Sequence, residues 1–149
     1  MLISTKSINI LAEKLKSERE IFCSGLFLSA RWLALSQLDH EGIQLIVLPD
    51  KDSAEYCAAD LYNLTDGDKV FFLPDSGKNL ERSNYKSTLG VQRTSAVGRI
   101  LDYSEGQLFI VTYPSALEEG IPDSEKIKES MLRLSVGDEI SHDEIVEIL

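Results

Sequence analysis

The sequence predicts an α/β fold in which helices cover both faces of a parallel β-sheet, giving three layers. Short apolar segments at 43–48, 70–73 and 108–111 alternate with segments of helical periodicity along the first three quarters of the 149-residue chain, and a proline lies within three residues after each of them. This alternation is typical of parallel sheets whose strands are joined by right-handed crossovers.

The first 40 residues predict a helix, a strand, a turn and a second helix. From Ser4 to Lys16, apolar residues recur at helical spacing, and Glu20 to Cys23 then indicate a short buried strand. Gly25 marks the turn, and the Ala- and Leu-rich segment from Ala30 to Leu38 predicts the second helix.

The middle of the chain predicts three further strands. Ile43 to Leu48 is nearly all aliphatic, which favours a strand covered on both faces. Asp52 or Ser53 is expected to cap the following helix, whose apolar face consists of Ala54, Cys57, Ala58 and Leu61. Val70 to Leu73 and Leu108 to Val111 predict the last two strands.

The segment between those two strands predicts a polar loop and then a helix. Asp75 to Asn84 indicates the loop. Gly90 and Gly98 weaken the helix prediction, and the expected apolar face consists of Leu89, Ala96, Val97, Ile100 and Leu101.

The C-terminal residues predict the beginning of another small domain. Met131, Leu132 and Leu134 form an apolar stretch, and the spacing of Ser141 and Glu144 is that of a capping box, so a helix is expected from about His142. No C-terminal helix signal precedes Leu149. We therefore expect an α/β domain over 1–130 and a truncated second domain over 131–149.

Composition and charge exclude several classes of function. The chain is 43% hydrophobic and 27% charged, which is ordinary for a globular protein. It has neither an apolar run long enough to span a bilayer nor a signal-peptide profile, so a cytoplasmic protein without membrane contact is expected. A net charge of −10 repels a phosphate backbone, which argues against direct DNA binding.

A degenerate phosphate-binding loop is predicted between the first strand and the second helix. A working loop has the form G-x-x-x-x-G-K-[ST], and the matching window here runs from Gly25 through Ser29, Ala30 and Arg31 to Trp32. Alanine replaces a glycine, a planar guanidinium replaces the ammonium, and tryptophan offers no hydroxyl to magnesium. Read alone, the window also fits an ordinary turn, because many α/β folds have a glycine after the first strand. If it derives from a phosphate loop, the domain is P-loop-NTPase-like, and its loop is not expected to bind nucleotide.

Other catalytic and metal-binding patterns are missing from the sequence. His40 and His142 lie far apart beside acidic residues, and neither is paired with a nucleophile motif. The aspartates of Pro49–Asp52 and Thr65–Asp68 lack the spacing of a calcium loop and are interpreted as turn and cap residues. Cys23 and Cys57, in apolar surroundings, are predicted to be buried free thiols. No catalytic residue and no metal site are predicted.

Several short strings resemble the UvrB-homologous N-terminal region of bacterial transcription-repair coupling factors. The most specific is Leu132-Arg133-Leu134-Ser135-Val136-Gly137-Asp138-Glu139-Ile140, followed by an acidic and hydrophobic segment. Ser24-Gly25 with Ser29-Ala30-Arg31 is similar to the degenerate loop of that family, and Phe72-Leu73-Pro74-Asp75 to its turn after the third strand. The resemblance covers nearly the whole chain and implies a fold like domain 1 of UvrB.

The resemblance also implies a role in nucleotide-excision repair. The parent protein would be an ATP-dependent DNA translocase that displaces stalled RNA polymerase and recruits UvrA. ATP and magnesium would act in its motor domains and not in this segment. UvrA contacts would lie mostly in the adjoining small domain, so no contact residue is assigned here.

Two other functions remain open at this stage. An active ATPase or helicase lobe would use Arg31 in place of the lysine and would bind Mg-ATP. A free-standing flavodoxin-like domain would bind a small ligand at the carboxyl edge of the sheet, around Gly25, Pro49 and Pro74.

Overall fold

The computed structural model describes residues 5–38, 40–77, 83–121 and 125. The chain divides into two compact units, residues 1–119 and 120–149, and every element described below belongs to the first. The expected domain boundary after residue 130, the apolar stretch and signature string at 131–140 and the capped helix from 142 lie outside the described residues.

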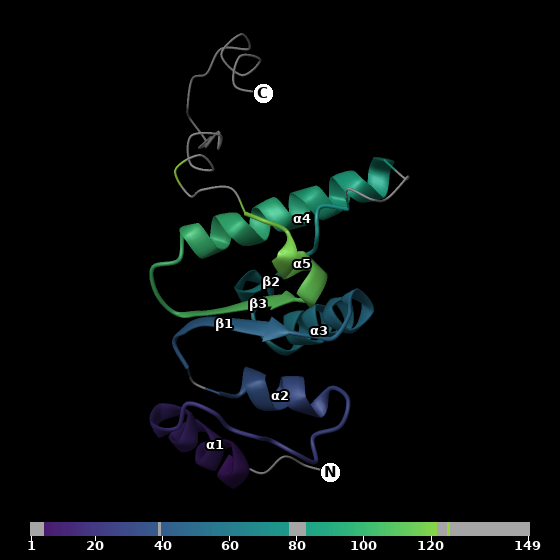
Figure 1. Cartoon of the computed structure of the whole chain (residues 1–149). Helices are drawn as coiled ribbons and strands as arrows, with labels where there is room; N and C mark the ends of the chain where they lie inside the picture. The colour runs from purple at the N-terminus through teal and green to yellow at the C-terminus, as the bar shows by residue number, and fades with distance from the viewer. Residues whose placement is uncertain (1–4, 39, 78–82, 122–124, 126–149) are drawn as a thin grey trace. The chain divides into compact units, whose positions relative to one another are not determined.

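The first unit is a small α/β domain with a three-stranded parallel sheet. β1 spans Gly42–Val47, β2 spans Val70–Phe72 and β3 spans Gln107–Thr112, and their order in the sheet is β1-β3-β2 (Figure 1). Both neighbours run parallel to β3. The parallel α/β prediction is confirmed for these three strands, while their order was not predictable from the sequence.

Five α-helices and one 3-10 turn accompany the strands among the described residues. They are α1 (Thr5–Ser17), α2 (Ala30–Ser36), α3 (Lys51–Leu64), η1 (Gly67–Lys69), α4 (Ser83–Leu101) and α5 (Pro114–Glu118). α4 forms in spite of its two glycines, because packing against β2 outweighs their weak helix propensity.

The N-terminus of α3 is capped by Asp50. Its carboxylate accepts hydrogen bonds from the Ser53 backbone N–H at 2.8 Å and the Ser53 hydroxyl at 3.1 Å. The first of these bonds, with a smaller effect of the second, lowers the pKa of Asp50. The prediction of Asp52 or Ser53 as the cap was wrong, because the helix already begins at Lys51.

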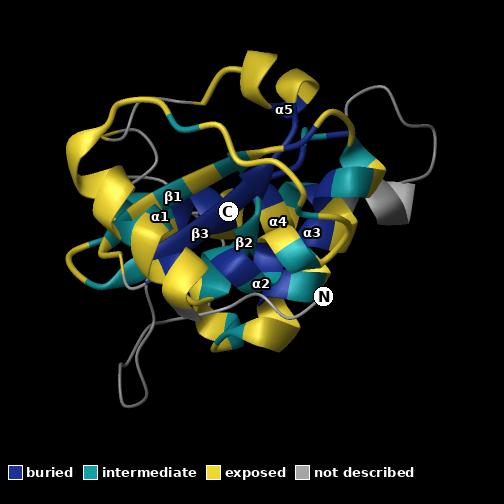
Figure 2. Cartoon of the chain, turned by 90° about the horizontal axis from the view of Figure 1, so that it is seen from below, coloured by how far each residue is buried: buried dark blue, intermediate teal, exposed yellow. Residues whose placement is uncertain are grey.

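The main core lies between the sheet and the apolar face of α3. Phe109 and Val111 of the central strand are fully buried there, together with Ala54, Cys57 and Leu61 of α3. Figure 2 shows β3 buried along its length. The apolar face predicted for α3 is confirmed at Ala54, Cys57 and Leu61. The helix α2 also packs against α3.

The opposite face of the sheet is covered only in part. α4 packs against β2, whereas Ile43, Leu45 and Val47 of the edge strand β1 are exposed on the side where their β3 partners Leu108, Ile110 and Thr112 are buried. Within the part of the chain that the structure describes, the expectation that β1 is covered on both faces was wrong. An aliphatic run shows that burial is favourable, but not whether a helix extends far enough to provide it.

The predicted strand at Glu20 to Cys23 does not form. These residues have no strand partner, Phe22 is exposed, and Cys23 is exposed instead of buried. Four residues are too few to show a periodicity that distinguishes a strand from an extended loop. The described sheet therefore has three strands instead of four.

Candidate functional site

The predicted phosphate-loop window forms the approach to α2. Gly25 is exposed and has a φ of 81°, in the left-handed region that favours glycine. Ser29 directly precedes α2, and its hydroxyl donates a hydrogen bond to the Asp60 carboxylate of α3 at 2.6 Å. The Ala30 backbone N–H donates to the Phe27 carbonyl at 3.1 Å, so the loop itself occupies a donor that a phosphate would need.

Arg31 and Trp32 lie against each other at the start of α2. The Arg31 guanidinium carbon is 4.5 Å from the centre of the Trp32 ring, and its Nε donates to the Leu28 carbonyl at 3.3 Å. Trp32, the last residue of the predicted window, is 7% exposed and belongs to the core cluster with residues of α3. Its buried ring anchors α2.

A pocket of about 360 Å³ lies between the loop and α3. From the predicted window, Ser29, Arg31 and Trp32 line it, whereas Gly25 and Ala30 do not. The remaining lining residues are Leu28 and, from α3, Ser53, Tyr56 and Asp60. Leu28 lies within the predicted window, whereas sequence reasoning missed the three residues of α3 as part of the site. The three α3 residues recur at helical spacing beside the predicted apolar face. This spacing is the feature of the sequence from which they could have been identified.

The positive charge of Arg31 acts on the Cys57 thiol, which lies in the core beneath the pocket. Burial raises the pKa of the Cys57 thiol to about 12, and the nearby Arg31 guanidinium opposes this shift only in part. A thiol with so high a pKa is almost entirely protonated at neutral pH and is a poor nucleophile. The pocket offers one exposed guanidinium, the carboxylate of Asp60, apolar walls and hydroxyl groups.

A hydrogen-bonded network closes the carboxyl edge of the sheet between β2 and β3. The Tyr113 hydroxyl donates to the Asp75 carboxylate and accepts from the Asp75 backbone N–H. The buried Arg93 of α4 donates to the carbonyls of Pro74 at 2.7 Å, Ala116 at 3.1 Å and Glu119 at 2.8 Å. These contacts involve the backbone around Pro74, near which the flavodoxin-like alternative would place its ligand.

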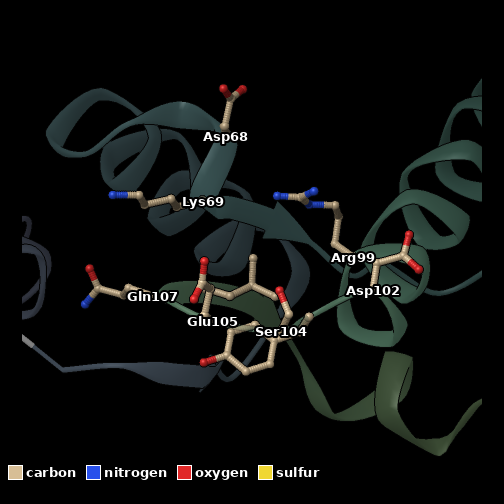
Figure 3. A pocket seen from close by; sticks show the side chains of 9 residues that line it. Asp68, Lys69, Arg99, Asp102, Ser104, Glu105 and Gln107 are labelled. Carbon is tan, nitrogen blue, oxygen red and sulfur yellow. The ribbon is translucent and has the colours of Figure 1, made fainter. Parts of the chain in front are cut away.

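A second pocket, of about 130 Å³, lies at the amino ends of β2 and β3 (Figure 3). Its charged side chains are of both signs, and Lys69 is paired with Asp66 at 3.1 Å. The Arg99 guanidinium lies over the Phe71 ring at 5.4 Å. Among the residues that the structure describes, no group of three or more His, Cys, Asp or Glu side chains could hold a metal ion.

Comparison of the chain with protein-family models, with curated proteins and with solved structures finds no match. Within the described part of the chain, no helix is both long and apolar enough to cross a membrane.

Proposed function

We propose that this chain is a non-catalytic interaction segment of a transcription-repair coupling factor. In that role it would belong to an ATP-dependent translocase that displaces stalled RNA polymerase from DNA and recruits UvrA during nucleotide-excision repair. The proposal joins two features: the altered phosphate loop and the similarity of Leu132 to Ile140 to the signature string of that family.

The observation that carries the non-catalytic part is the position of Trp32. A magnesium-dependent loop needs a hydroxyl there, and the indole is instead packed in the core against α3. Restoring a hydroxyl would remove a large buried side chain, so the loop cannot regain this function by a small rearrangement. The Ala30 N–H bond to Phe27 supports the same interpretation.

The first experiment is a calorimetric titration of the chain with Mg-ATP at millimolar concentrations, beside the Arg31→Ala variant. We expect no saturable heat from either protein. Saturable heat that disappears in the variant would contradict the proposal and favour the ATPase or helicase lobe, because Arg31 would then replace the phosphate-binding lysine.

The second experiment reads the gene beyond the codon for Leu149. The proposal expects the reading frame to continue into a small domain and then into helicase motor domains. A stop codon directly after Leu149 would contradict it and favour a free-standing ligand-binding domain.

A further inference from the structure

The loop before α2 exposes large apolar side chains next to the pocket that Arg31 and Asp60 line. Phe27 is 77% exposed and Leu28 is 82% exposed, and across the pocket Tyr56 of α3 is 75% exposed. Leu28 has a φ of 49°, the only positive value recorded for a described residue other than glycine. A strained leucine that contributes little burial does not stabilise the domain by itself, which points to a role in contact with another molecule.

The Arg31 guanidinium in this pocket has unused hydrogen-bonding capacity. Among the described residues no carboxylate lies within ion-pair distance of it, and its recorded contacts are the Leu28 carbonyl and the Trp32 ring. Both contacts hold the guanidinium in place and leave its two terminal nitrogens available. A fixed guanidinium of this kind binds a carboxylate through two parallel hydrogen bonds.

The other charged group of the pocket, Asp60, already has a hydrogen-bond donor. Its carboxylate keeps its negative charge and accepts a bond from the Ser29 hydroxyl, whereas the terminal nitrogens of Arg31 have no acceptor among the described residues. The unused donors of Arg31 favour a partner group that accepts two parallel hydrogen bonds, as a carboxylate does, and the apolar walls favour aliphatic neighbours for it.

We infer that this pocket binds a segment of a partner protein in which a carboxylate side chain is flanked by aliphatic side chains. The carboxylate would bind Arg31, and the aliphatic groups would pack against Leu28 and Tyr56. The inference deepens the proposed function and rests on it, because the pocket must be free of nucleotide. In this interpretation the altered loop binds a partner protein.

The chain offers its own probe for this site. Trp32 is the single tryptophan of the sequence and lines the pocket directly under Arg31, so its fluorescence reports on occupancy. The ligand to titrate is an N-acetylated, C-amidated Leu-Glu-Leu tripeptide. We expect a saturable change in emission with a dissociation constant on the order of 1 mM, since few groups make contact.

Two matched peptides test the two halves of the recognition. A Leu-Gln-Leu tripeptide keeps the shape and removes the charge, and we expect binding to weaken about tenfold because charge-assisted hydrogen bonds are lost. A Gly-Glu-Gly tripeptide keeps the charge and removes the aliphatic groups, and it should also bind more weakly. Equal affinity for the glutamate and glutamine peptides would overturn the inference, as would no saturable change at about 20 mM Leu-Glu-Leu.

Protein variants locate the site. Arg31→Gln should abolish the preference for glutamate over glutamine, and Leu28→Gly, which suits the positive φ, should weaken binding without unfolding the domain. Arg99→Gln is the matched control, because Arg99 is also an exposed arginine stacked on an aromatic ring, in the other pocket. An Arg99→Gln effect as large as that of Arg31→Gln would contradict the assignment.

Mg-ATP and inorganic phosphate complete the experiment. Peptide binding without binding of either phosphate ligand supports both the inference and the proposed function. If neither the peptide nor Mg-ATP binds, the inference alone fails. Mg-ATP binding that displaces the peptide, or occurs without peptide binding, defeats both. Inorganic phosphate that binds more tightly than the peptide would make the pocket a phosphate site and overturn the inference alone.

Discussion

Tyr113 and Asp75 join the ends of two neighbouring strands through two hydrogen bonds. The Tyr113 hydroxyl donates to the Asp75 carboxylate at 2.9 Å and accepts from the Asp75 backbone N–H at 3.1 Å. Tyr113 follows β3 and Asp75 lies shortly after β2, so one side chain holds together the two segments that leave the carboxyl edge of the sheet.

Tyr113→Phe should therefore destabilise the domain. The ring is buried, and the change leaves a carboxylate and an N–H without their partner, which costs about 1–3 kcal/mol. Urea unfolding should show a lower midpoint with an unchanged slope. Tyr56→Phe, at an exposed phenol, is the control and should have almost no effect. Equal losses in the two variants would show that the paired hydrogen bonds do not stabilise the fold.

Stability should decline in alkaline solution. The pKa values of Cys57 and Tyr113 are both raised to about 12, chiefly by burial, from ordinary values of 9.0 and 10.0. Below about pH 8 both groups are almost entirely neutral in the folded and the unfolded chain, and their contribution is complete. Between pH 9 and 12 the unfolded chain ionises first, so folding is progressively disfavoured.

Urea midpoints measured from pH 8 to pH 11 test this dependence. Cys57→Ala and Tyr113→Phe should each flatten the decline, and an absorbance titration of the phenols should show one tyrosine of five ionising last. A stability that is constant over this pH range would refute the assignment.

The two cysteines should differ sharply in reactivity. Cys23 is exposed, whereas Cys57 is fully buried in the core. A disulfide-exchange reagent at pH 8 should label one thiol at once and the second only when urea unfolds the chain. In Cys23→Ser the fast phase should vanish. Two fast-reacting thiols in the native protein would mean that the core around α3 opens readily.

Replacing Arg93 should cost more than replacing any exposed arginine. Arg93→Met leaves three carbonyl groups without their donor, and we expect a loss of about 2–4 kcal/mol in thermal unfolding followed by circular dichroism. Arg93→Lys keeps the charge, but a compact ammonium does not span the same carbonyls, so an intermediate loss is expected. Arg99→Lys, at an exposed site, should change stability by less than about 0.5 kcal/mol.

The parallel strands were predictable because each is a short apolar run that ends near a proline. Their order was not, because it depends on how the crossovers pack and not on local pattern. The strand predicted at Glu20 to Cys23 shows the same limit, since its four residues could form a strand only with a partner that the described fold does not supply.

The candidate site was predictable in part. The loop pattern identified Ser29, Arg31 and Trp32 before their surroundings were known. Tyr56 and Asp60 meet them only because α2 packs against α3, a contact between segments about 30 residues apart. The stacking of Arg31 on Trp32 likewise depends on side-chain orientation, which residue spacing does not reveal.

The central position of β3 determines which amide hydrogens are exposed only when the whole domain unfolds. Its backbone is bonded to β1 on one side and β2 on the other, and Phe109, Ile110 and Val111 are fully buried. Amide hydrogens of β3 should therefore exchange with solvent only through global opening, while those of β1 that point away from β3 exchange through local motion. The free energy of exchange at Ile110 thus measures the stability of the whole first unit.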